Sequence, residues 1–252
     1  MKKILVIILS FFFTGLMISC QNNPIIMTIT EAFELMNESI ENFRNAESVE
    51  LDYHGEYAST LHLLTDDLRV RIKRIGSDNM VGNISVNMVV NDETTLVFTN
   101  YQKGIIYNHT IDNTQSDKKF ESKSKTDFIN LYTMFIKSKI AIEDTQNRSL
   151  STTSKELTLT FDLSSSAIEK TLYVLPAMDY AKDAKVVITF SEKAKLLRLS
   201  VEYQGRIDSV YGDFSYSVDF LKINTYVIVP TLSASEISRS EEHTSELQSR
   251  QS

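Results

Sequence analysis

The folded part of the chain opens with apolar residues at helical spacing. They recur at three- and four-residue intervals, at Phe33, Met36, Ile40 and Phe43. This spacing is typical of a helix with one buried face. Thr28 and Glu31 have the spacing of a capping box. We therefore predict a helix that begins after Thr28 and ends near Ala46.

After this helix the pattern changes to strict alternation of apolar and polar residues, which indicates antiparallel strands with one buried and one solvated face. The first example is 49–57, where Glu50, Asp52, His54 and Glu56 separate the apolar positions. Further predicted strands are 68–72, 84–88, 96–98, 105–107, 157–163, 186–190, 197–203, 214–220 and 226–229. Short polar or glycine-containing turns separate most of these segments.

Two further helices interrupt the predicted strands. Residues 113–125 form a polar gap, and a second amphipathic helix follows, capped by Ser124 or Asp127. Its apolar positions are Phe128, Leu131, Phe135 and Ile136. A short helix over 165–175 is expected to end at Pro176, since proline cannot continue a helix. The turn-like sequence Thr65-Asp66-Asp67 is interpreted as a solvated turn.

The order of elements predicts an α+β fold: a large curved antiparallel sheet, in effect an incomplete barrel, with an N-terminal helix and two inserted helices. A sheet hides its apolar face only against another layer, and the helices can supply that layer. Inward-facing aromatic residues would then line either a solid core or an apolar pocket, and the pattern does not separate the two.

The N-terminus has the organisation of an export signal. Lys2 and Lys3 precede an apolar run, 4–18, that is shorter than the roughly 20 residues of a spanning helix. The run ends in Leu16-Met17-Ile18-Ser19-Cys20, which resembles the lipobox of bacterial lipoproteins. The resemblance implies that 1–19 is a signal peptide, that Cys20 is acylated, and that 20–26 is a tether. The alternative is an uncleaved signal anchor with an incidental cysteine.

The C-terminal residues 239–252 differ from the rest of the chain. Their sequence over 239–249, Arg-Ser-Glu-Glu-His-Thr-Ser-Glu-Leu-Gln-Ser, resembles the translation of a sequencing adapter, which implies an artefact. The alternative is a natural polar tail. We therefore expect one domain over 27–238.

Composition narrows the possible functions. The 252 residues carry a formal net charge of −7, which argues against a nucleic-acid partner. A single cysteine excludes a disulfide framework and a cysteine-based zinc site. His54, His62 and His109 lie far apart in the sequence, and His54 fits a charged outer sheet face with Arg69, Arg71 and Lys73. We expect no catalytic residues, no metal, no cofactor and no enzymatic activity.

The lipobox, the first helix, the one-sided strands and the central helix together resemble the lipoprotein-carrier fold of LolA and LolB and the LppX/LprG-type lipoproteins. The resemblance covers about 27–230 and rests on the order of elements, so it assigns no ligand-contacting residue. In that family an incomplete barrel with helices over its mouth holds acyl chains. The resemblance implies an extracytoplasmic lipoprotein of the bacterial membrane that binds a lipid or other apolar ligand on the concave face. The alternative is a non-enzymatic surface interaction module with a filled core.

Overall fold

The computed structural model describes residues 25–61, 63–102, 104–112, 116–122, 125–174, 180–207, 209–231, 233 and 235. Cys20 with the leader, His62, Pro176 and the segment 239–252 lie outside the described residues.

Helix α2 (Ile29–Arg44) begins at the predicted capping box. The Thr28 hydroxyl accepts a hydrogen bond from the Glu31 backbone, and the Glu31 carboxylate accepts one from the Thr28 backbone at 2.8 Å. Its buried face contains all four residues of the predicted stripe. The helix ends two residues earlier than predicted, at Arg44, with Asn45 as its C-cap.

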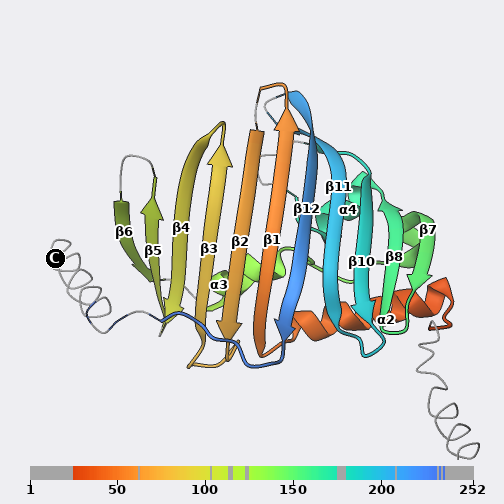
Figure 1. The fold of residues 1–252 in the computed structure, drawn as a ribbon, viewed down its shortest axis with the longest axis horizontal. Helices are drawn as coiled ribbons and strands as arrows, with labels where there is room; N and C mark the ends of the chain where they lie inside the picture. The colour runs from red at the N-terminus through yellow and green to blue at the C-terminus, as the bar shows by residue number, and fades with distance from the viewer. Residues whose placement is uncertain are drawn as a thin grey trace, which may run out of the picture.

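The described residues form a twelve-stranded antiparallel sheet (Figure 1). Its strands are β1 (Ser48–Ser59), β2 (Leu63–Lys73), β3 (Val81–Val90), β4 (Glu93–Gln102), β5 (Ile105–Ile111), β6 (Ser116–Ser122), β7 (Thr145–Thr152), β8 (Glu156–Leu163), β9 (Tyr180–Ala181), β10 (Ala184–Ser191), β11 (Leu196–Ile207) and β12 (Val210–Ile223). The spatial order is β6-β5-β4-β3-β2-β1-β12-β11-β10-β8-β7, with β9 paired to β11. The first and last long strands are therefore central neighbours, and the sheet stays open.

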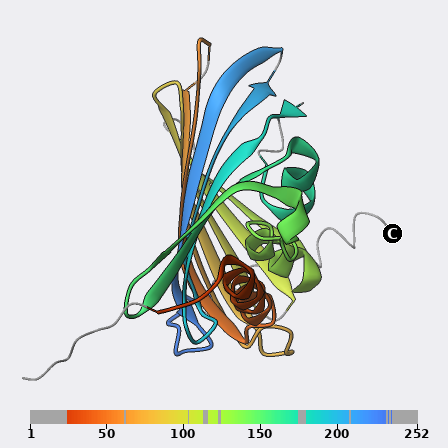
Figure 2. The same cartoon turned by 90° about the vertical axis from the view of Figure 1, so that its right-hand side faces the viewer.

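Helices α3 (Lys125–Thr133) and α4 (Ser165–Thr171) are inserted between strands, as predicted. Figure 2 shows them on the same side of the curved sheet as α2, and we call this side the inner face. Asn37 of α2 exchanges two hydrogen bonds of 2.9 Å with the backbone of Ile140, and Arg44 donates to the Ile136 carbonyl at 3.0 Å. These contacts attach α2 to the segment that follows α3. The α+β fold with an open curved sheet and two inserted helices is confirmed.

The helices cover the inner face unevenly. Helix α2 contacts β7, β8, β10 and β11, where Phe33 packs against Phe161 with ring centroids 5.3 Å apart. On the other side of the sheet centre, Phe128 of α3 lies against Gly82, near the start of β3, and against Tyr101, near the end of β4. Farther from Phe128, from the row of Leu68, Val86 and Val97 onward, the inner apolar residues of β2, β3 and β4 are only half-buried.

Two predictions about the strands are wrong. The polar gap contains β6, which pairs with β5 at the sheet edge. Six of its seven residues are polar or charged, a composition that natural edge strands use against further pairing.

The predicted last strand, 226–229, pairs with no strand among the described residues. Asn224 and Thr225 hydrogen bond to the start of β1, and the chain then crosses in front of the lower strand ends (Figure 1). Val227 and Val229 are buried, whereas Tyr226 is 81% and Ile228 67% exposed. The alternation in the sequence therefore corresponds to alternating burial. The segment cannot pair with β1, because β2 and β12 already lie on both sides of that strand.

Candidate functional site

A cluster of polar atoms lies within the aromatic core of the inner face. Alternation along β1 places Tyr53 and Gly55 on this face, and Gly55 pairs with Asp66 of β2 and Tyr216 of β12. The Tyr53 side chain bends over Gly55, so that its hydroxyl lies where a Cβ on Gly55 would be. The hydroxyl is thereby brought into the cross-strand row of Asp66 and Tyr216.

Three atoms of this row are buried without a hydrogen-bond partner among the described residues: Tyr53 Oη, Tyr216 Oη and Asp66 Oδ1. Tyr53 and Tyr216 are each only 3% exposed. The backbone of Tyr173 lies close to the Tyr216 hydroxyl and tends to lower its pKa, but the geometry falls short of a hydrogen bond. More than nine in ten buried polar groups in proteins have a partner, so this set is unusual.

Aromatic packing holds the hydroxyls in place. The Tyr53 ring stacks on Phe135 at 4.9 Å and contacts Tyr216 and Tyr173 at 5.7 and 6.0 Å. Tyr173 and Tyr216 are also 6.0 Å apart, edge to face. Tyr173 follows α4 and Phe135 follows α3, so the segment after each inserted helix contributes a ring. We call Tyr53, Asp66, Tyr173 and Tyr216 the Tyr–Asp cluster.

Burial changes the acid–base properties of the cluster. Desolvation raises the pKa of Tyr173 to about 12 and raises those of Tyr53 and Tyr216 well above their usual range. Each hydroxyl therefore keeps its proton at neutral pH and remains a hydrogen-bond donor. Burial, and secondarily the charge of Asp67, raises the pKa of the Asp66 carboxyl.

Asp66 lies within a strand, contrary to the prediction from the sequence. Thr65-Asp66-Asp67 is not a solvated turn but the middle of a ladder in which Asp66 pairs with Gly55 and Met88. The signal was present in the sequence, because Leu64, Asp66 and Leu68 alternate in phase with the rest of β2. The two adjacent acids, Asp66 and Asp67, favoured the interpretation as a turn, since aspartate is common in turns.

A half-buried apolar surface borders Asp66. We call it the wing patch, and it consists of Leu64, Leu68, Val86, Met88 and Val97 on the inner face of β2, β3 and β4. Leu64, Leu68 and Val86 pack on the main core, whereas the patch as a whole keeps part of its surface exposed. Asp66 is thus a carboxyl group surrounded by partly exposed apolar side chains.

The outer face carries the predicted charged pairs. Arg69 forms an ion pair with Asp52, and Arg71 bonds Glu50 at 3.2 Å, which Lys222 also bonds at 2.7 Å. The partner of His54 is Asp67, at 2.6 Å, rather than a basic residue. In the described part of the chain, no three acidic, histidine or cysteine side chains are placed to hold a metal ion.

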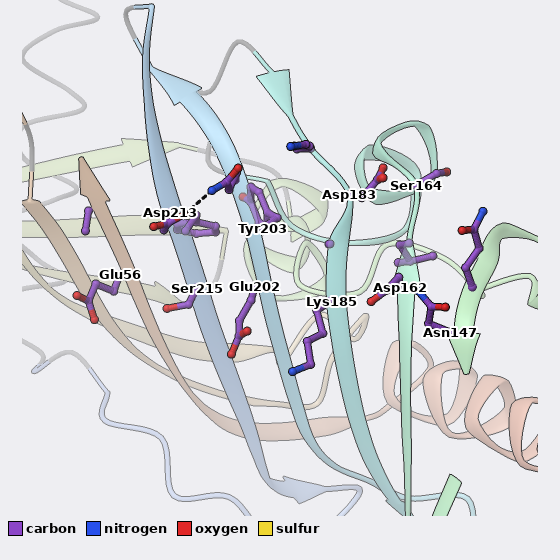
Figure 3. Close-up of a pocket in the computed structure, with 17 residues that line it drawn as sticks. Glu56, Asn147, Asp162, Ser164, Asp183, Lys185, Glu202, Tyr203, Asp213 and Ser215 are labelled. Carbon is purple, nitrogen blue, oxygen red and sulfur yellow. Dashed lines mark hydrogen bonds between the residues drawn. The ribbon is translucent and has the colours of Figure 1, made fainter. Parts of the chain in front are cut away.

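A hollow on the outer face has a volume of about 760 Å³ (Figure 3). One cross-strand row forms its floor: Glu56, Ser215, Glu202, Lys185, Asp162 and Gln146. Figure 3 shows side chains of this row and of Asp183 and Asp213 around the hollow. We call it the outer groove; five acidic and two basic side chains are among those that line it.

Cys20, the one functional residue singled out from the sequence, lies outside the described residues. No helix among the described residues has both the length and the apolar composition needed to cross a bilayer. The cluster residues Tyr53 and Tyr216 were predicted to face inward, but nothing in the sequence placed their hydroxyls beside Asp66.

Comparison with known proteins assigns no family. A scan against protein-family models gives no match, and a search of curated proteins gives no significant match. Among solved structures, LprF from Mycobacterium bovis is similar with 10% identity and a TM-score of 0.44, over 80% of this chain and 97% of that one. Rv2717c from M. tuberculosis has 7% identity and a TM-score of 0.26, over 74% and 98%. A DUF1329 family protein from Desulfovibrio piger has 10% identity and a TM-score of 0.25, over 80% and 95%.

Proposed function

We propose that this protein is a non-enzymatic, membrane-anchored lipoprotein of the bacterial cell envelope that binds a lipid or other apolar ligand on the inner face of its sheet. The observation that carries the proposal is the wing patch, a partly exposed apolar surface on the concave side, directly beside unpartnered polar groups. An amphiphilic ligand would satisfy both, because its chain would cover the patch and its head would reach the polar atoms.

The anchor in this proposal is Cys20, at the end of the lipobox-like sequence. The leader 1–19 would be removed, 20–26 would serve as a tether, and 27–238 would form the domain outside the cytoplasm. One acyl chain gives marginal binding, whereas two or more hold a protein stably on a bilayer. The described chain begins beside the β7–β8 turn, where the backbone of Ile25 bonds the Thr153 carbonyl at 3.1 Å.

The anchor is tested by comparing the protein with its Cys20→Ser variant in the native host. We expect the natural protein in the membrane fraction, with a mass showing an acylated N-terminal cysteine. The variant should be found in the soluble extracytoplasmic or culture fraction. An unmodified protein that still begins at Met1 would contradict the lipoprotein assignment.

The ligand is tested with the full chain carrying Cys20→Ser, so that no acyl group of its own competes. We expect lipid to co-purify and to be detected by native mass spectrometry. Introducing a charge into the wing patch, with Val86→Asp, should abolish uptake of a fluorescent acyl probe. Leu221→Asp, at an exposed position outside the wing patch, is the matched control and should leave uptake unchanged.

A second function is supported by a different observation. The outer groove has a volume of about 760 Å³, and the sheet half behind it is packed with buried aromatic side chains. An interaction module that binds a protein or polysaccharide through this groove would need no apolar pocket. Glu202→Gln with Lys185→Gln should then abolish partner binding, while leaving uptake of the acyl probe unchanged.

A further inference from the structure

The Tyr–Asp cluster contains more unpartnered polar atoms than an aromatic core would retain for stability alone. Two hydroxyls and one carboxylate oxygen converge on the row through Gly55, and each is buried without a partner among the described residues. A buried donor or acceptor left unpaired destabilises the folded state, because its desolvation is not compensated by a hydrogen bond. The atoms therefore have unused bonding capacity at the border of the wing patch.

The charges around the cluster restrict the head group that could bind there. The charged groups that act on its members are Asp66 itself and Asp67, both acidic. The nearest basic residue on β2, Arg69, is on the opposite face and is paired with Asp52. An anionic head group would meet repulsion at Asp66 with no compensating cation close to it among the described residues, in a partly desolvated place where charge interactions are strong.

The hydrogen-bonding capacity of the cluster fits an uncharged head group that carries hydroxyls. Tyr53 and Tyr216 can donate to ester or hydroxyl oxygens, because burial keeps their protons in place. An ionised Asp66 only accepts hydrogen bonds, so its partner must be a donor, such as a lipid hydroxyl. A fatty-acid carboxylate offers no donor and adds a second negative charge.

We propose that Tyr53, Tyr216 and Asp66 bind the head group of an uncharged, hydroxyl-bearing acyl lipid, of which monoacylglycerol is the simplest, while its chain lies on the wing patch. This inference rests on the proposed lipid-binding function and specifies the chemistry of its ligand. The tyrosine hydroxyls donate to the glycerol and ester oxygens, and Asp66 accepts from a glycerol hydroxyl. The cluster thereby selects against free fatty acids of the same chain length.

The test compares two probes that differ only in their head group, 1-monopalmitoylglycerol and palmitate. Binding to the full chain carrying Cys20→Ser is measured by equilibrium dialysis at pH 8, below the aggregation limit of each lipid. We expect monopalmitoylglycerol to bind at least about tenfold more tightly than palmitate. Tyr53→Phe and Tyr216→Phe should each weaken it about three- to tenfold, as for the loss of one hydrogen bond, and leave palmitate unchanged.

Tyr132→Phe is the matched control. Its hydroxyl is also buried without a partner among the described residues, but it lies on α3 against Phe43 and outside the cluster. This variant should bind both lipids like the parent. Asp66→Asn, which removes the charge and keeps the shape, should strengthen palmitate binding.

The possible results are distinct. If palmitate binds as tightly as monopalmitoylglycerol, or if the two cluster variants behave like Tyr132→Phe, the head-group assignment is overturned while the lipid site remains. If the folded protein binds neither probe, the proposed lipid-binding function is contradicted, and this inference is contradicted with it. Circular dichroism of each variant establishes that the comparison is made on folded protein.

Discussion

The hydroxyl of Tyr53 lies in the space that a side chain on Gly55 would occupy. Tyr53 and Gly55 are two residues apart on β1 and lie on the same face of the sheet. Both fit there only because Gly55 has no Cβ. The Tyr53 ring can therefore lie along its own strand, stacked on Phe135, and its hydroxyl reaches the row of Asp66 and Tyr216.

We expect Gly55→Ala to lower the free energy of unfolding by about 1–3 kcal/mol, because the new methyl group overlaps the Tyr53 hydroxyl in a packed core. Urea denaturation measures the change. Tyr53→Phe lacks the overlapping oxygen. The double variant should therefore lose less free energy of unfolding than the sum of the losses in the two single variants. Strict additivity would show that the two side chains do not compete for this space.

Asp66→Asn is expected to change how stability depends on pH. Burial raises the folded-state pKa of Asp66 above its usual value of about 3.9. The folded chain then keeps a proton that the unfolded chain has lost, so this group's contribution to stability falls as the pH rises from about 4 through the raised pKa. The variant should gain stability relative to the parent at pH 8 but not at pH 3. A difference that is constant over this range would contradict the shift.

The ion pairs of the outer face should differ in their effect on stability. Glu50 is 12% exposed in its side chain and bonds both Arg71 and Lys222. Glu50→Gln is expected to cost about 1–3 kcal/mol, between the values for exposed and fully buried pairs. Asp67→Asn, which removes the exposed partner of His54, should cost less than about 0.5 kcal/mol. Equal losses in thermal unfolding would refute this ranking.

Gly82→Ala should weaken the attachment of α3 to the sheet. A Cβ at Gly82 would lie 2.1 Å from Cε1 of the Phe128 ring, so the two would overlap. We expect a loss of about 1–3 kcal/mol and faster amide hydrogen exchange in α3 than in α2. The control is Ser85→Ala, on the outer face of the same strand, which should leave exchange in α3 unchanged.

Much of the fold could be predicted because burial is periodic. The capping box at Thr28 and the stripe from Phe33 to Phe43 predicted α2 to within two residues of its end, since both signals are local. The alternation around Glu50 and His54 likewise predicted which side of β1 is charged. Periodicity did not indicate β6, whose sequence is polar except for Phe120, and it predicted a strand at 226–229, which pairs with no described strand.

The sequence by itself determined the faces of the elements, because the direction of a side chain follows from helical or strand geometry over a few residues. The sequence also identified Cys20 as the candidate residue for a lipid anchor. Only the tertiary structure decided the strand order, with β12 beside β1, and the registers that bring Asp66, Gly55 and Tyr216 into one row. Pairing between distant strands depends on the packing of the whole sheet, and alternation is the same for every possible neighbour. The Tyr–Asp cluster is therefore a product of register, which no local pattern encodes.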